Sequence, residues 1–247
     1  FILCYRGADT YGFMHRTFLE YFCAVEIVHR FEKQRTLTFE QLRDEVFGQH
    51  WQDETWHEVL RLICGMLDPK FTEQLIDWLI GQEETNKFIN IFLAVDCLLE
   101  QDVHKRSVEV ADQLLRSLKN LMKYGPYGED SEDNGRILRV RKGSVVAILK
   151  ICLNDLETLN WLKEVALFDD TLGDNKDIVM GIAHGWGKDP SILDWLKDCI
   201  HSEKPIRSTA RYGALIAMQE LYSDDPDALA IFKKAARTGD NWGFKLS

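Results

Sequence analysis

Hydrophobic residues recur along this chain at steps of three and four, the spacing of one face of an α-helix. Nearly every segment has this period, and no alternation typical of a β-strand runs for long. The first strong helix is predicted over about residues 13–34, with Phe18, Tyr21 and Phe22 expected in the core. Further helices are predicted over about 87–101 and 105–124. The pattern predicts an all-α fold.

Several helix starts are marked by their residues. Thr38 and Gln41 have the spacing of a capping box. Asp68-Pro69 predicts a break and a restart, because aspartate accepts hydrogen bonds from open amides and proline suits the first helical turn. The same dipeptide recurs as Asp189-Pro190 and Asp225-Pro226. Three of the five prolines are therefore predicted to begin helices.

An internal repeat occupies the second half of the chain. Its copies are DLETLNWLKEVA (155–166), DPSILDWLKDCI (189–200) and DPDALAIFKKAA (225–236), whose first aspartates are 34 and 36 residues apart. The helices before them also align, and residues 205–221 resemble a HEAT-type first helix through Arg207, Ala210, Ala214 and Leu215. One helix pair cannot bury its apolar face alone, so such units stack. We therefore expect an α-α superhelix, a HEAT-like solenoid.

The tryptophans of the second half have different expected roles. Trp161 and Trp195 occupy equivalent repeat positions, and we interpret them as core side chains that join successive units. The alternative is an aromatic stripe that binds a ligand. Trp186, between two glycines, and Trp242 are less constrained. An exposed ring at either position is a predicted contact for a protein partner.

A glycine-rich acidic stretch, YGPYGEDSEDNGR, divides the chain. Its acidic spacing does not match the calcium-binding loop of EF-hands, so we interpret it as a solvated loop. The predicted organisation is a helical region over 1–67, a helical linker or early repeats over 68–124, this loop over 125–138, and HEAT-like repeats over 139–247.

Composition narrows the classes of partner. The net charge is -10, with 40 acidic and 30 basic residues, which argues against nucleic acid because phosphates are bound by Lys and Arg. The six cysteines are scattered and form no CxxC pair, as expected for reduced thiols in a cytoplasmic protein. No apolar run reaches the ~18 residues of a membrane span. The chain also lacks an initiating Met, and we expect it to be a fragment.

Catalytic motifs are absent from the sequence. It contains no GxxxxGK followed by Ser or Thr, no HExxH, no GxSxG and no GxGxxG. We therefore predict no catalytic residue and no cofactor in this segment.

Three residues have a spacing that could suit a metal site. His50, His57 and Cys64 lie seven residues apart and would share a face of a continuous helix. Gly48 and Asp53 suggest that the helix starts only after His50, and tryptophans nearby favour a packing role. No metal site is predicted.

The stretch GFMHRTFLEYFCA (12–24) is the most specific signal. It resembles the motif F-x-H-x-(S/T)-F-x-E-(F/Y)-(F/L)-A-A of NACHT-type STAND ATPases, which include animal NOD-like receptors and their bacterial relatives. Cys23 replaces an alanine, a change between small residues. The resemblance is close over about a dozen residues and looser to about residue 67. The matching residues are Phe13, His15, Thr17, Phe18, Glu20, Tyr21, Phe22 and Ala24.

The resemblance implies that 1–67 is the helical end of a winged-helix region that follows a nucleotide-binding core. It implies that His15 senses the terminal phosphate of bound ADP, so ATP or ADP belongs to the intact protein rather than to this segment. An imidazole N–H can donate one hydrogen bond to a phosphate oxygen. The alternative is that His15 only caps or packs the helix.

The function implied is a non-catalytic regulatory and ligand-sensing segment of a signalling or defence ATPase. Its expected partners are another protein and its own upstream ATPase core, and a repeat array offers a long surface for them. The main alternative is a HEAT-like scaffold of the bilin-lyase type, which holds a chromophore or a phycobiliprotein. An independent hydrolase is a third, less favoured option.

Overall fold

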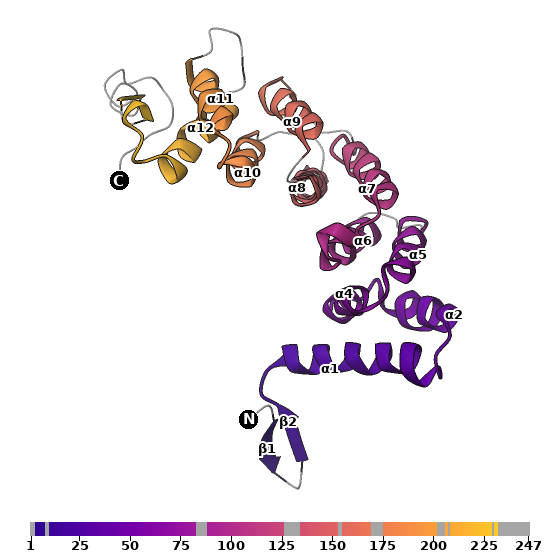
Figure 1. Ribbon diagram of the computed structural model, residues 1–247. Helices are drawn as coiled ribbons and strands as arrows, with labels where there is room; N and C mark the ends of the chain where they lie inside the picture. Colours follow the sequence, from indigo (N-terminus) through magenta and orange to yellow (C-terminus); the bar gives the residue numbers. More distant parts are fainter. Residues whose placement is uncertain are drawn as a thin grey trace. The chain divides into compact units, whose positions relative to one another are not determined.

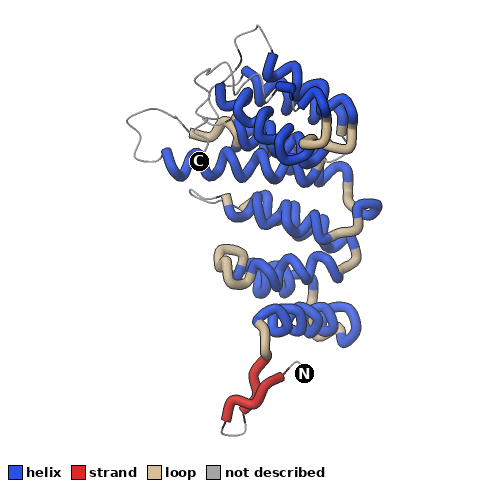
Figure 2. The backbone as a smooth tube through the Cα atoms, turned by 90° about the vertical axis from the view of Figure 1, so that its left-hand side faces the viewer, coloured by secondary structure: helices blue, strands red, loops and turns tan. Residues whose placement is uncertain are grey.

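The computed structural model describes residues 3–7, 10–82, 88–125, 134–152, 155–168, 175–201, 206, 208–228 and 230–231. The chain has an all-α helical-repeat fold, as predicted, with one short β-hairpin near its start (Figures 1 and 2). It forms two compact units, residues 1–117 and 118–247. Within the described residues, no helix combines the length and the apolar character needed to cross a bilayer.

Unit 1 is built from short helices in sequence. Its helix α1 packs on α4, and α4 and α5 both pack on α6. The boundary between the units crosses α7. The elements are β1 (Leu3–Gly7), β2 (Thr10–Phe13), α1 (Arg16–His29), η1 (Arg30–Gln34), α2 (Phe39–Gln41), η2 (Leu42–Phe47), α3 (Gly48–His50), α4 (His57–Met66), α5 (Pro69–Ile80), α6 (Ile89–Glu100), η3 (Val103–Lys105) and α7 (Val108–Leu121).

The predicted helix starts of unit 1 are confirmed. The Thr38 side chain accepts a hydrogen bond from the Gln41 amide, and the Gln41 side chain accepts one from the Thr38 amide, which completes the capping box. Asp68 is the N-cap of α5, and its carboxylate accepts a hydrogen bond from the Lys70 amide at 3.0 Å. Pro69 is the first residue of that helix.

A buried polar contact joins three helices of unit 1. The carbonyl oxygen of Cys64, on α4, accepts hydrogen bonds from the Thr72 hydroxyl and the Gln101 side-chain amide. Gln101, which follows α6, also donates to the Thr72 oxygen at 3.3 Å. All three residues are buried, so this contact satisfies polar atoms that would otherwise be costly to desolvate. The surrounding core includes Leu42, Phe47, Leu60, Ile63, Leu75, Ile76, Leu79 and Leu98.

The hairpin was not predicted from the sequence. Its strands span five and four residues, too few for a period-two pattern to stand out from a helical one. The antiparallel register pairs Leu3 with Phe13 and Tyr5 with Tyr11. Since alternate residues of a strand share a face, these four apolar side chains lie on the same face of the hairpin.

The long first helix also differs from the prediction. It begins at Arg16 rather than near residue 13, because the preceding residues are extended in β2. Its last part, Arg30–Gln34, is a π-helix, and Arg35 ends it in the left-handed region at φ 54°.

Unit 2 contains the aligned repeats. Its helices are α8 (Asn134–Ile151), α9 (Leu156–Phe168), α10 (Lys176–Trp186), α11 (Pro190–His201) and α12 (Ser208–Leu221). α10 packs against α8, α9 and α12, and α11 packs on α12. The acidic loop expected over 125–138 is shorter, because α8 already begins at Asn134. Residues 126–133 of that expected loop lie outside the described residues.

The repeated aspartates cap their helices in the same way. The Asp155 carboxylate accepts from the Glu157 amide at 3.0 Å, and Asp189 accepts from the Ser191 amide at 2.9 Å. Asp225 accepts from two amides, those of residues 227 and 228, at 3.0 and 3.1 Å. The three repeats therefore begin by one mechanism, as the sequence predicts. Leu229 and residues 232–236 of the third repeat lie outside the described residues.

Replacing Asp155 with alanine is expected to cost about 1 kcal/mol of unfolding free energy at neutral pH, the usual contribution of an N-cap. The hydrogen bond from the Thr158 hydroxyl, aided by the Glu157 and Thr158 amides and by Lys119, lowers the pKa of the Asp155 carboxyl. Because the folded pKa lies below the unfolded value of about 3.9, this contribution is complete above that pH and is lost as pH falls through the folded pKa.

Urea unfolding followed by circular dichroism at neutral and acidic pH measures this effect. Asp155→Asn is the matched control, because asparagine caps as well as aspartate but does not titrate. The mechanism is refuted if Asp155→Ala is neutral, or if the difference between wild type and Asp155→Asn does not change with pH.

Each repeat is contacted by a lysine that precedes it. The lysines are Lys119 on α7, Lys163 on α9 and Lys197 on α11, and we call the set of contacts the lysine ladder. Ammonium groups over ring faces gain a cation–π attraction, and the third step replaces the ring with carboxylates. The contacts are Lys119 Nζ to the Trp161 ring centre at 4.7 Å, Lys163 Nζ to the Trp195 ring centre at 5.5 Å, and Lys197 Nζ to Asp225 and Asp227 oxygens at 3.7 and 2.9 Å.

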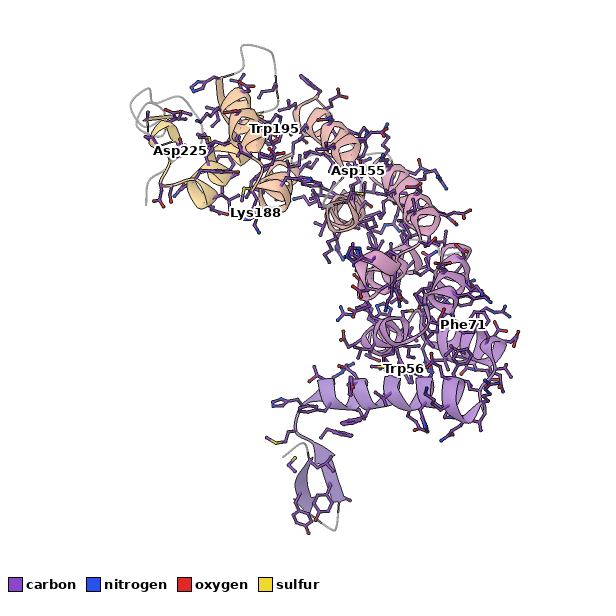
Figure 3. All side chains as sticks on the ribbon, viewed as in Figure 1. Trp56, Phe71, Asp155, Lys188, Trp195 and Asp225 are labelled. Atoms are coloured by element: carbon purple, nitrogen blue, oxygen red, sulfur yellow. The ribbon has the colours of Figure 1, made fainter. Side chains whose placement is uncertain are left out.

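Trp161 and Trp195 therefore join successive repeats, as predicted. Their side chains are half-buried, however, rather than part of the buried core. Each ring lies under the lysine of the preceding repeat. In Figure 3, Asp155 lies just before α9, Trp195 lies on α11, and Asp225 follows α12, so the three mark successive repeats of the array. The same lysines also lower the pKa of the capping carboxyls of Asp155 and Asp189, although hydrogen bonds from the following residues lower it more.

α10 and α12 approach each other closely. The approach is made by small buried residues of α12: Ala210, Gly213, Ala214 and Ala217. A Cβ added at Gly213 would lie 2.9 Å from the Cα atom and 3.0 Å from the carbonyl oxygen of Lys176. Glycine is required there because backbone, rather than a movable side chain, occupies the space.

Candidate functional site

His15 lies at the junction between β2 and α1. It is the N-cap residue of α1, with extended backbone at φ −127° and ψ 142°, but its side chain makes no capping hydrogen bond. The imidazole is exposed, and its ring centre lies 6.2 Å from that of Phe18. The alternative in which His15 caps the helix is therefore not the arrangement adopted.

The start of α1 is suited to a negatively charged group. Helix N-termini present free amides and the positive end of the helix dipole. The first turn of α1 carries no acidic side chain that would neutralise it. Arg16 is held in place there, with 2.6 Å from its Nε to Glu20 and 2.8 Å from its Nη2 to the carbonyl oxygen of Thr55, before α4.

The expectation that Tyr21 and Phe22 belong to the core is wrong. They are 46% and 41% exposed, and Phe18 is half-buried. α1 packs on α4 with its opposite side, where the buried residues are Glu20, Ala24 and Val28. Ala24 and the aliphatic part of Glu20 allow the two helices to approach. The large aromatic side chains of the motif point towards solvent instead.

These aromatic side chains continue those of the hairpin. The Tyr5 and Tyr11 rings meet edge-on at 5.5 Å, Phe13 stacks on Phe22 at 5.8 Å, and Phe22 meets Tyr21 at 5.5 Å. We call this set the aromatic face; its members are Leu3, Tyr5, Tyr11, Phe13, Tyr21 and Phe22.

The predicted partner contact at Trp186 is contradicted by its burial. Trp186 is 7% exposed and is the last residue of α10, rather than lying in a loop between helices. A glycine follows it, and the carbonyl oxygen of this Gly187 accepts a hydrogen bond from the Tyr222 hydroxyl at 2.9 Å. Its role is packing at this helix end. Trp242 lies outside the described residues.

His50 and His57, two of the three candidate metal ligands, have other contacts. α4 begins at His57, so His50 is not on the helix that carries Cys64. The His50 ring stacks on Trp56 with 3.8 Å between ring centres, and His57 Nε2 lies 2.8 Å from the carbonyl oxygen of Trp51. Among the residues that the structure describes, no group of three or more potential ligands is placed to hold a metal ion.

Unit 1 also has an open depression of about 510 Å³ beside the end of α6. Its charged lining residues are Glu100, Asp102 and Lys105. Glu100 is held 2.8 Å from Arg61, which keeps that carboxylate in an ion pair. The other lining residues supply neither a nucleophile nor a histidine base: Gly65, Met66, Leu67, Pro69, Gln101 and Val103.

Comparisons with known proteins give no relative: no family model, no curated protein and no solved structure matches this chain.

Proposed function

We propose that this chain is a non-catalytic regulatory segment of a NACHT-type signalling or defence ATPase, acting in the cytoplasm by binding protein. In the intact protein, His15 donates a hydrogen bond to the terminal phosphate of ADP held by the upstream ATPase core. The repeats of unit 2 bind the sensed ligand or a partner protein. ATP or ADP is then a ligand of the core, and this segment only reports its presence.

The position of His15 carries the proposal. Its imidazole is exposed, makes no capping bond, and stands at the N-terminus of a helix whose first turn has no acid. An imidazole N–H and a helix N-terminus are both favourable partners of a phosphate oxygen. The motif that resembles the family therefore places its histidine where contact with a nucleotide from another domain is sterically open.

The regular repeats support a binding role. N-caps, apolar faces and the lysine ladder recur from one unit to the next. Stacked helix pairs of this kind commonly serve as extended binding surfaces, and their specificity comes from side chains on the exposed side.

The coding sequence that precedes Phe1 tests the assignment directly. A nucleotide-binding core with the GxxxxGK motif in the same reading frame, within about 400 residues or two to three domains, is the expected finding. A start codon at this point, or an upstream region without that motif, would overturn the assignment and leave a helical-repeat binding protein.

Replacing His15 with alanine in the protein that includes the upstream core is expected to weaken ADP binding about 10- to 100-fold, the loss of one hydrogen bond to a charged group. Isothermal titration with ADP measures it. His29→Ala is the matched control, because His29 is also exposed but lies at the other end of α1. Equal ADP affinity of wild type and His15→Ala would contradict the sensor role.

A further inference from the structure

Two buried cysteines of unit 1 meet between α4 and α6. Cys64, on α4, and Cys97, on α6, have no exposed surface, and their thiols share a hydrogen bond. The two positions are distant in the sequence, with the whole of α5 between them. Neither belongs to the motif at the start of α1 or to the repeats of unit 2. The pair is therefore a separate feature of the core.

The packing of α4 on α6 holds these cysteines side by side. A Cβ added at Gly65, the residue after Cys64, would lie 3.2 Å from the Cβ of Glu100. The carbonyl oxygen of Cys64 accepts a hydrogen bond from the side-chain amide of Gln101, which lies one helical turn after Cys97. Contacts on both sides of the thiols thus fix the register of the two helices.

This arrangement suits a disulfide. Two cysteines can be bridged without backbone movement only where their side chains point towards each other. Thiols that share a hydrogen bond across two packed helices meet this condition. What remains is the step from that contact to a covalent S–S bond of about 2.05 Å, which lies within the reach of rotations of the two side chains.

In the closed fold the pair is protected from oxidation. The hydrogen bond to Cys64, followed by burial, raises the pKa of the Cys97 thiol well above its usual range. The thiolate is the form that reacts with oxidants, so Cys97 stays reduced, and burial shields Cys64. Cys4 and Cys23, by contrast, are partly exposed. Oxidation of the buried pair therefore follows a local opening of unit 1, of the kind that native proteins undergo.

We propose that Cys64 and Cys97 form a redox switch: after a local opening, an oxidant of the peroxide class converts them into a disulfide that joins α4 to α6. One thiolate attacks a peroxide oxygen and becomes a sulfenic acid, and the hydroxide released takes up the proton that this thiol lost, which gives water. The second thiol then attacks the sulfenic sulfur, and its proton leaves with hydroxide as a second water. In total the two thiols lose two protons and two electrons, and hydrogen peroxide is reduced to two waters.

Reclosing of the helices decides the product. Because the two sulfur atoms are in contact in the closed fold, the sulfenic acid meets a thiol at a high effective concentration, before a second peroxide converts it to a sulfinic acid. The disulfide closes a loop that contains the whole of α5, and it prevents α4 and α6 from separating. The oxidised chain is thus held closed until a thiol reductant cleaves the bond.

Peroxide treatment of the full chain, followed by peptide mass mapping without reduction, tests this proposal. The chain carries Cys4→Ser and Cys23→Ser, so that the partly exposed thiols contribute no disulfide. The expected product links the peptides of Cys64 and Cys97 and raises Tm by roughly 5–15 °C, and dithiothreitol reverses both changes. Cys199, also buried but on α11 of unit 2, is the internal control and is expected to stay reduced.

Cys97→Ala in the same chain is the matched variant, because alanine leaves no polar atom in the buried site. Peroxide is expected to leave its Tm unchanged, and Cys64→Ala makes the same test from α4 if Cys97→Ala does not fold. The proposal is overturned if Cys64 and Cys97 remain unlinked under conditions that oxidise Cys4 and Cys23 of the wild type. It is also overturned if the linked chain has an unchanged Tm, or if peroxide raises the Tm of Cys97→Ala equally. None of these outcomes depends on nucleotide or on an upstream core, so the proposed ATPase assignment is tested separately.

Discussion

Replacing Phe47 with alanine is expected to lower the free energy of unfolding by about 3–5 kcal/mol, the range for removing a buried aromatic ring. Phe47 ends η2 and is fully buried, the largest of the side chains in unit 1 with no exposed area. Its removal loses the transfer free energy of the ring. It also leaves a cavity that the short, capped helices around it close only partly.

Tyr11→Ala is the matched control for this loss. It removes an aromatic ring of similar size, but one that is 67% exposed, so its effect on the unfolding of the single chain is expected to stay within about 0.5 kcal/mol. Urea unfolding followed by circular dichroism, at a concentration too low for association, measures both variants. Equal losses for Phe47→Ala and Tyr11→Ala would show that the core of unit 1 is not placed as described.

Gly213→Ala is expected to destabilise the chain by about 2 kcal/mol, although alanine is the better helix former by about 1 kcal/mol. The added methyl group would meet the Lys176 backbone at 2.9 and 3.0 Å, so α10 and α12 must move apart. Other small residues of α12 lie along the same contact, and a shift at Gly213 therefore disturbs several buried contacts at once.

Gly135→Ala isolates this steric effect. Gly135 is also helical, in the first turn of α8, but an added Cβ meets nothing within 4 Å. The substitution is expected to be neutral or to stabilise the chain by up to about 1 kcal/mol. The two variants are compared by urea unfolding. If Gly213→Ala also stabilised the chain, the close approach of α10 and α12 would be excluded.

Local sequence signals predicted most of the helices. Capping residues act within three or four positions of themselves, so Thr38, Asp68 and Asp189 could be assigned without knowledge of their surroundings. The repeat alignment added information of longer range. It identified Trp161 and Trp195 as equivalent positions, and the structure shows that each of these rings lies under a lysine that precedes its repeat.

The features that the sequence did not predict depend on which other elements of the fold pack against a given residue. Helical period identifies an apolar side of α1, but it cannot tell whether that side packs on another helix, and here Ala24 faces α4 while Tyr21 and Phe22 do not. Flanking glycines suggested a loop at Trp186, where the helix instead continues to its last turn and buries the ring. His15 could be singled out only by resemblance, since its exposure follows from the hairpin that precedes it.

The lysine ladder has a consequence for how such a chain changes length in evolution. The contact between one repeat and the next is the same along the array. A lysine on the preceding side meets an aspartate cap with a ring or a second carboxylate on the following side. Excision of residues 155–188 would bring Lys119 against Trp195 and Asp189, the same types of partner that it has in Trp161 and Asp155. Whole repeats can thus be lost or duplicated in frame, because each new junction again pairs a lysine with an aspartate cap and a ring or carboxylate.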